Sequence, residues 1–372
     1  MSEKYEIIVV GAGISGAVLA ERYANVLGKR VLVLETRNHI AGNCHDYYNE
    51  HGILVSKYGA HLFHTSFEDV WEYVNQFSEW LPYEHRVLCH VDGRLVPLPV
   101  NIKTVNILFR ENLKNEKEMK DWLKNNVRKI SRPKNSEESA LARMGHVIYE
   151  TLFKQYTKKQ WDLWPHELEA SVLERIPVRT NFDDRYFSDT HQAQPKEGYT
   201  EMFKKMLSHK NITVLLNTDY FDINYKLKGF EKLFFTGPID KFFSEGYDRL
   251  QYRSLRFEFT TYNEEYFQEN SVINYPSDYD FIRIVEFKHM TGQKHPKTTV
   301  SREYPTWEGE PYYPVPSQRN KNLYEMYKKE AEVLEKDGIY FVGRLANYKY
   351  FNMDQAFKNS LDLFKRLNPM VK

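Results

Sequence analysis

Three glycines near the N-terminus have the spacing of a nucleotide-binding turn. Gly11, Gly13 and Gly16 directly follow the apolar run 7–10, and a helical pattern continues from them to about residue 27. At such a turn, glycine lets backbone N–H groups approach a pyrophosphate, and the N-terminus of the helix favours its negative charge. A second apolar run ends at Glu35, whose carboxylate can accept a hydrogen bond from a ribose hydroxyl. The sequence therefore predicts a βαβ unit that binds a dinucleotide.

This pattern alone does not distinguish NAD from FAD, but two further segments favour FAD. Residues 37–43 form a glycine-containing turn soon after Glu35, and Gly343-Arg344 follows a late apolar run. Together they resemble the extended FAD-binding site of the amine-oxidase-like flavoproteins, in which N-terminal and C-terminal segments enclose the cofactor.

The elements that must position these residues begin with a hairpin and a helical region. Two extended stretches within 85–100 flank Asp92-Gly93, a pair that tolerates positive φ and suits a tight turn. Helical periodicity follows between about residues 102 and 176, where Asn135 and Glu138 have the spacing of an N-cap and its capping-box partner. We therefore expect a helical region inserted after the hairpin.

The second half of the chain predicts strands of two kinds. Short apolar runs that predict buried strands rejoining the first sheet occur at 213–216 and 232–235. Alternating patterns that predict an antiparallel sheet with one solvated face occur at 255–259, 281–288 and 297–302. The predicted fold is thus α/β, with a discontinuous Rossmann-like FAD-binding domain, an inserted helical bundle and an antiparallel β-sheet domain. The predicted boundaries are 1–84, 196–245 and 336–372 for the FAD domain, 101–180 for the helical domain, and 85–100, 181–195 and 246–335 for the antiparallel, substrate-side domain.

Composition excludes several classes of protein. The 372 residues carry 52 Lys plus Arg against 51 Asp plus Glu, so the balance lacks the positive field of a nucleic-acid-binding protein. No apolar run approaches the roughly 18 residues of a membrane span, and no signal peptide is visible. Two cysteines in a chain of this length favour a reducing compartment, so we expect a cytoplasmic protein without membrane insertion.

Several longer segments resemble the signature segments of UDP-galactopyranose mutases, the flavoenzymes that interconvert UDP-galactopyranose and UDP-galactofuranose. The likeness runs in order through the whole chain, at residues 57–65, 156–161, 175–179, 182–187, 236–240, 283–286, 310–315 and 343–346. It implies an isomerase that supplies galactofuranose for cell-surface glycans. It also implies that the helical domain, residues 101–180, carries a mobile lid over the substrate, in the segment that contains Arg175. It also implies a homodimer, and the inserted helices are the natural place for subunit contacts.

The family resemblance also implies the chemistry. Reduced FAD would use its N5 as the nucleophile on the anomeric carbon of the sugar, forming a covalent adduct while UDP leaves and returns, with no net redox change. The protein must then supply positive charge for the diphosphate, a dry pocket for the sugar and an aromatic platform for uracil. The sequence does not identify the reductant.

Residue roles follow from matching positions in the family. Catalytic roles are implied for Arg175, Arg283, His64 and Trp161, the two arginines as a diphosphate clamp because a guanidinium fits phosphate oxygens as a charged fork. Substrate contacts are implied for Phe153, Tyr156, Thr157, Trp161, Arg175, Tyr186, Arg283, Tyr313, Tyr350 and His85. Cofactor contacts are predicted at Gly11, Gly13, Ile14, Ser15, Gly16, Glu35, Arg37, Gly42, Asn43, His61, Leu62, Gly237, Gly343, Arg344, Tyr350, Asn352 and Met353.

Two features needed separate interpretation. His61 and His64 have a spacing that metal sites use, but no Cys or carboxylate set accompanies them, so no metal is predicted. Ala41 and Asn352 stand where relatives commonly have Gly and Asp, and for Asn352 we expect altered affinity rather than lost chemistry. Gln160 is interpreted as structural.

Other functions stay open at this level. An amine-oxidase-like oxidoreductase would consume an electron acceptor, and the arginines and the Trp161 segment argue against it. A catalytically silent nucleotide-sugar sensor would keep the fold and FAD. Within the mutases, UDP-N-acetylgalactosamine could replace UDP-galactose, because pocket volume near the sugar C2 cannot be read from sequence.

Overall fold

The computed structural model describes residues 5–370, and its first layer is a five-stranded parallel sheet. In spatial order the strands are β10 (Ile212–Leu215), β2 (Val31–Leu34), β1 (Ile7–Val10), β11 (Lys232–Phe235) and β17 (Ile339–Phe341). The central strands β1 and β2 are runs of Val, Ile and Leu, as expected for strands covered on both faces. A strand forms close to the predicted range 213–216, but the prediction that it is buried is wrong, because β10 lies at the sheet edge and is only half-buried.

Helices cover both faces of this sheet. One face packs on a core that draws apolar side chains from α1 (Ile14–Asn25), α2 (Glu68–Val74), α9 (Tyr199–Met206) and α14 (Met353–Leu367). The other face packs near α10 (Tyr220–Ile223) and α11 (Ile239–Phe242). The predicted Rossmann-like layer is confirmed.

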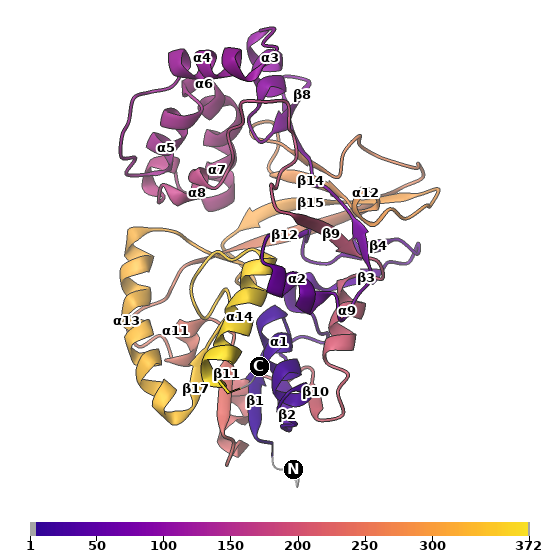
Figure 1. Cartoon of the computed structure of the whole chain (residues 1–372), viewed down its shortest axis with the longest axis vertical. Helices are drawn as coiled ribbons and strands as arrows, with labels where there is room; N and C mark the ends of the chain where they lie inside the picture. The colour runs from indigo at the N-terminus through magenta and orange to yellow at the C-terminus, as the bar shows by residue number, and fades with distance from the viewer. Residues whose placement is uncertain (1–4, 371–372) are drawn as a thin grey trace.

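A seven-stranded sheet forms the second layer, and Figure 1 places it between the parallel sheet and the helical insert. Its strands, in spatial order, are β16 (Tyr313–Pro314), β12 (Tyr252–Tyr262), β15 (Thr298–Thr306), β14 (Arg283–Glu286), β13 (Val272–Asn274), β7 (Val87–Val91) and β8 (Arg94–Leu98). The pairing is antiparallel except between β13 and β7. The Asp92-Gly93 turn joins β7 to β8 as predicted.

Smaller elements connect these layers. A three-stranded sheet consists of β5 (Phe63–Thr65), β9 (His191–Pro195) and β6 (Trp80–Pro82), and a two-stranded ribbon of β3 (Asp46–Tyr48) and β4 (Leu54–Ser56). The helices α12 (Lys288–Thr291) and α13 (Gln318–Leu334) complete the second half. Strand β9 lies in the predicted antiparallel domain, but it pairs with β5 and β6, which lie in the predicted FAD domain. This small sheet therefore crosses a predicted boundary, and the domain boundaries stay a prediction.

The helical insert lies at the end of the molecule opposite the parallel sheet (Figure 1). It comprises α3 (Ile102–Phe109), α4 (Glu116–Asn126), α5 (Ser136–Arg143), α6 (His146–Ile148), a π-helical stretch (Tyr149–Lys154), α7 (Gln155–Trp161) and α8 (Ser171–Glu174). Its apolar side chains share one core with β7, β8, β13 and β14. Asn135 caps α5 by accepting from the Glu138 N–H, but the Glu138 carboxylate accepts from Lys134 instead, so only half of the predicted capping box forms.

None of the helices among residues 5–370 is long and apolar enough to cross a membrane.

Candidate active site

A cavity of about 450 Å³ opens at the carboxyl ends of the parallel strands. That edge is where sheets of this kind bind nucleotides. Of the predicted cofactor contacts, the following line it: Gly11, Gly13, Ile14, Ser15, Glu35, Arg37, Gly42, Asn43, His61, Gly237, Gly343, Arg344, Asn352 and Met353. We call it the dinucleotide cavity.

The three glycines of the N-terminal turn differ in what an added side chain would contact. Gly11 has φ +101°, and a Cβ there would lie 2.2 Å from Thr236 Oγ1. Gly13 faces Gly42 across the cavity wall, where a Cβ on Gly42 would come within 2.8 Å of the Gly13 Cα. Gly16 does not line the cavity, because a Cβ there would lie 1.9 Å from the Gly11 carbonyl oxygen, so its role is close packing of helix on strand.

Acidic and basic groups flank this turn. Glu35 accepts hydrogen bonds from the backbone N–H groups of Ala12 and Arg37 at 2.8 and 2.9 Å. Arg37 pairs with Glu310 and donates to Asn43 at 2.9 Å. Ala41 holds the left-handed conformation with φ +73° and is fully buried, at a position whose backbone conformation favours glycine.

A second cavity of about 400 Å³ lies where the helical insert meets the seven-stranded sheet. All predicted catalytic and substrate contacts line it: His64, His85, Phe153, Tyr156, Thr157, Trp161, Arg175, Tyr186, Arg283, Tyr313 and Tyr350. Leu62, predicted as a cofactor contact, and Tyr350, predicted as a contact of both cofactor and substrate, line this cavity and not the first. We call it the substrate cavity.

The two cavities share part of their walls. His61, Arg344, Asn352 and Met353 line both. The two cavities are therefore adjacent at this wall.

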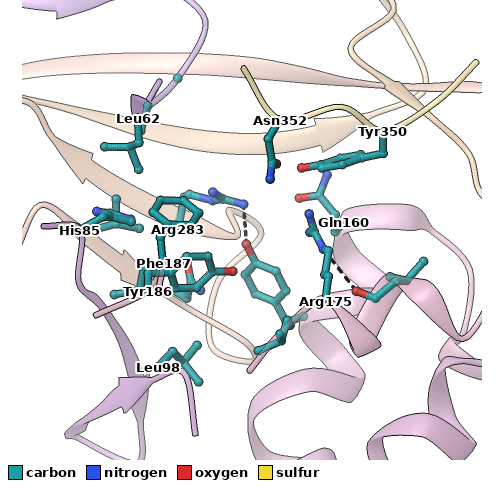
Figure 2. Close-up of a pocket in the computed structure, with 18 of the residues that line it drawn as sticks. Leu62, His85, Leu98, Gln160, Arg175, Tyr186, Phe187, Arg283, Tyr350 and Asn352 are labelled. Atoms are coloured by element: carbon teal, nitrogen blue, oxygen red, sulfur yellow. Dashed lines mark hydrogen bonds between the residues drawn. The ribbon is translucent and has the colours of Figure 1, made fainter. Parts of the chain in front are cut away.

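Two arginines enter the substrate cavity from different layers. Arg283 comes from the sheet and Arg175 from the end of α8, and Figure 2 shows both side chains pointing into the same space. Arg283 donates from Nη2 to the Tyr156 hydroxyl at 2.6 Å, and its Nε lies 3.3 Å from a carboxylate oxygen of the buried Glu303. Although burial opposes charge there, these two neighbours raise the pKa of Arg283, so it stays protonated.

Tyr350 lies between the cations of this cavity. The guanidinium carbons of Arg175 and Arg344 stand 4.5 and 5.2 Å from its ring centroid, and Tyr313 stacks on it at 5.5 Å. Burial favours the neutral phenol, but the nearby arginines outweigh it and lower the pKa of Tyr350. The cluster is electropositive and suits a group with more than one negative charge.

Three histidines line the same region without forming a metal site. Burial lowers the pKa of His61 to about 4 and that of His85 to about 3, so both are neutral at pH 7. His64 bonds through Nδ1 to Asp189 at 2.7 Å. Within the residues that the structure describes, no group of three or more His, Cys, Asp or Glu side chains could hold a metal ion.

Comparison with known proteins assigns the family. A family model described as UDP-galactopyranose mutase matches residues 151–350, and one described as an NAD(P)-binding Rossmann-like domain matches residues 9–77. A probable UDP-galactopyranose mutase of Klebsiella pneumoniae is 38% identical over 361 residues, covering 95% of this chain and 92% of that protein. The chain belongs to the UDP-galactopyranose mutase family. It is therefore an enzyme of the isomerase class.

Other relatives are consistent with this family. A dTDP-fucopyranose mutase of Escherichia coli is 35% identical over 96% of this chain and 97% of that protein. A crystal structure of a reduced UDP-galactopyranose mutase aligns with a TM-score of 0.77 at 17% identity, covering 99% of this chain and 94% of that one. A putrescine oxidase variant aligns with a TM-score of 0.56 at 11% identity, covering 98% and 99% of the two chains. These two structures support the fold alone.

The structure of this mutase-family chain adds residues that sequence reasoning missed. The Asn274 side-chain oxygen is buried without a hydrogen-bond partner in the wall of the substrate cavity. Asn274 pairs with Arg283 across β13 and β14, so a hairpin register could have indicated it. Gln160, which was interpreted as structural, also lines this cavity (Figure 2), as do Glu303 and Asp189.

Proposed function

We propose that this protein is a flavin-dependent mutase that interconverts UDP-galactopyranose and UDP-galactofuranose. One observation carries the proposal: the substrate cavity, which contains Arg175 and Arg283, shares a wall with the dinucleotide cavity, which contains the glycine-rich turn. A nucleotide sugar and a dinucleotide cofactor fit these two cavities, and their reacting ends would meet at the shared wall.

The residues of the dinucleotide cavity fit FAD. The narrow approach between Gly13 and Gly42 leaves a wall of backbone that suits a pyrophosphate, and Glu35 at the end of β2 suits a ribose. Arg344, Asn352 and Met353 would hold the ring end, because they line both cavities. When bound and reduced, FAD supplies a nucleophilic N5 for the anomeric carbon of the sugar.

Arg175, Arg283 and Tyr350 would hold the diphosphate. Conversion of the ring requires UDP to leave the sugar and later return, so the protein must stabilise UDP in both states. Guanidinium groups keep their charge and offer paired donors, and the phenol can donate to an anionic oxygen. These residues act by binding and orientation and need no proton transfer of their own.

Aromatic side chains would hold the base. Phe153 and Tyr156 line the substrate cavity where α7 and the preceding π-helical stretch form its wall. A base stacked on an aromatic ring gains about 1–3 kcal/mol. This anchor would keep the nucleotide in place while the sugar changes its ring.

The segment carrying Arg175 would act as the substrate lid. It includes the end of α8 and the residues after it, and the carbonyl groups of Leu173, Glu174 and Ile176 accept hydrogen bonds from one side chain, Arg143 of α5. A closed lid would exclude water while the sugar is open.

The Escherichia coli relative gives a second candidate, a dTDP-sugar mutase. Its 35% identity is close to the 38% of the Klebsiella pneumoniae protein, so the residues around the base and the sugar C6 decide between the two. UDP-N-acetylgalactosamine stays a third candidate substrate. We further propose a cytoplasmic homodimer that supplies galactofuranose for cell-surface glycans.

The deciding experiment separates nucleotide sugars by chromatography after incubation with purified protein, with and without dithionite. UDP-galactopyranose, UDP-galactofuranose, UDP-N-acetylgalactosamine and dTDP-fucose are tested in parallel. Interconversion of the galactose pair only after reduction supports the proposal. Preferential turnover of dTDP-fucose would replace it with the second candidate, and consumption of an electron acceptor would indicate an oxidoreductase.

A further inference from the structure

A carboxylate–imidazole pair, in which the imidazole is buried and the carboxylate partly exposed, forms one corner of the substrate cavity. His64 on β5 and Asp189, which precedes β9, lie 125 residues apart in the chain, and Nδ1 of the histidine is 2.7 Å from Asp189 Oδ2. The other carboxylate oxygen, Oδ1, accepts a hydrogen bond from Ser66 at 2.9 Å. Both Asp189 and His64 line the substrate cavity.

The imidazole is fixed in orientation as well as in position. Its ring stacks on Phe187 with centroids 3.6 Å apart and an angle of 14° between the planes. The His64 side chain is only 7% exposed. Stacking and the bond to Asp189 together leave the ring one orientation in the cavity wall.

The carboxylate also determines which ring nitrogen carries the proton. An ionised carboxylate can only accept, so Nδ1 must be the donor. The hydrogen bond from His64 is the largest cause of the lowered pKa of Asp189, which keeps this carboxylate ionised. In the neutral ring Nε2 is then an acceptor, and no group in residues 5–370 forms a hydrogen bond with it.

Interconversion of the two sugar rings needs a group that can accept a proton and return it. The pyranose and furanose forms differ in which sugar oxygen is in the ring and which carries hydrogen. One O–H bond must break at the oxygen that closes the new ring, and one must form at the oxygen that left the old ring. No proton or electron is gained or lost overall, so a single site that accepts and returns one proton is sufficient.

We propose that Asp189 is a positioning residue that holds His64 with Nε2 available to transfer this proton between the two sugar oxygens. This inference rests on the proposed function, because it requires a sugar in the substrate cavity. Neutral Nε2 takes the proton from the closing hydroxyl, and the imidazolium returns it to the released oxygen. The Asp189 carboxylate stabilises the imidazolium while it exists. Two other titratable groups, His85 and Asp354, are near enough to interact electrostatically with His64.

The chain offers a matched control. His191 on β9 bonds through Nε2 to Glu68 at 3.1 Å and stacks on Trp71 at 4.6 Å. This second carboxylate–histidine pair lines neither cavity. Glu68→Gln therefore makes the same chemical change as Asp189→Asn at a site that cannot contact the sugar.

The test combines kinetics with a measurement that needs no turnover. In the reduced holoenzyme we expect Asp189→Asn to lower kcat about 100-fold, the lower end of general acid–base catalysis. The Kd for UDP should stay within about twofold, Asp189→Glu should recover part of the loss, and Glu68→Gln should change kcat less than about twofold. In ¹⁵N-histidine-labelled protein, the His64 signals should show a protonated Nδ1 in the wild type and lose that pattern in Asp189→Asn.

The outcomes separate the two proposals. If the wild-type protein interconverts no nucleotide sugar, both the proposed function and the proton transfer are wrong. The tautomer measurement still tests the pairing of Asp189 with His64 in that case. An active wild type with kcat unchanged in Asp189→Asn overturns the inference alone. So does a His64 ring protonated at Nε2 in the neutral wild-type protein.

Discussion

Arg283 on β14 donates from Nη2 to the phenolic oxygen of Tyr156 on α7 at 2.6 Å, across 127 positions of sequence. This bond joins the seven-stranded sheet to the helical insert within the substrate cavity (Figure 2). The guanidinium is thus held by a side chain that itself lines the proposed uracil site. In the proposed function, binding of the base and binding of the diphosphate would therefore be linked through this one contact.

The first prediction concerns the charge and shape of Arg283. Arg283→Lys keeps the charge but loses the paired donors, so we expect kcat/KM to fall at least 100-fold, which corresponds to about 2.7 kcal/mol of transition-state stabilisation. Arg283→Ala should nearly abolish turnover while FAD stays bound. Arg256→Lys, on the exposed side of β12, is the control and should leave kcat/KM unchanged. Near-normal activity in Arg283→Ala would remove this residue from the proposed clamp.

The second prediction separates folding from cofactor binding at the glycine turn. A Cβ at Gly13 would meet only the Gly42 Cα, at 3.6 Å, and its φ is −80°, so Gly13→Ala should fold normally. The added methyl group would nevertheless occupy the approach to the pyrophosphate, so we expect the purified variant to contain little FAD. Absorbance at the flavin bands and thermal melting measure the two effects. Full flavin content in Gly13→Ala would place the pyrophosphate elsewhere.

A matched variant sharpens this test. Gly16→Ala would bring a Cβ within 1.9 Å of the Gly11 carbonyl oxygen. We therefore expect it to lower the melting temperature even without cofactor, in contrast to Gly13→Ala. Equal melting temperatures for the two variants would contradict the packing role of Gly16.

The third prediction concerns stability at acid pH. Burial lowers the pKa of His61 to about 4 and of His85 to about 3, whereas an unfolded histidine titrates near 6.5. Below pH 6.5 the unfolded chain binds protons that the folded chain does not, so the free energy of unfolding should fall as pH decreases from about 6.5 to about 4. Between pH 6.5 and 5 each of these two histidines should add to the slope, and replacing one of them should remove its share. Denaturant unfolding of the wild type and of His85→Asn at several pH values measures how the free energy of unfolding depends on pH. The same dependence in both proteins would contradict a neutral, buried His85.

The fourth prediction concerns the lid. Arg143 donates from Nη1 to the carbonyl groups of Leu173 and Glu174, both at 2.9 Å, and from Nη2 to that of Ile176 at 2.7 Å, on either side of Arg175. Arg143→Met should loosen this segment, raise KM for the nucleotide sugar about tenfold and leave FAD content unchanged. Arg128→Met, at an exposed arginine, is the control. An unchanged KM would mean that the lid keeps its position without Arg143.

Much of this protein could be predicted from local sequence. The glycine turn, Glu35 and the Asp92-Gly93 hairpin are short, contiguous patterns whose backbone requirements hold in any context. Family resemblance then indicated side chains that line the substrate cavity, including Arg175 and Arg283. The roles of these side chains stay predictions.

Other features depended on how distant segments pack. The edge position of β10 follows from sheet order, which its apolar sequence does not encode. Gly16 fits the nucleotide-binding spacing, yet its contact is with the Gly11 carbonyl, because helix and strand approach closely there. Gln160 became a cavity residue only when α7 packed against the seven-stranded sheet.

The sequence by itself determined the nucleotide-binding turn, the hairpin and the family, because these were identified from short segments of neighbouring residues. Only the tertiary structure decided that the two cavities share His61, Arg344, Asn352 and Met353, and that Asp189 meets His64. The physical reason is that such contacts arise when strands and helices separated by more than a hundred residues pack together. No local pattern of charge or hydrophobicity specifies which two side chains then face each other.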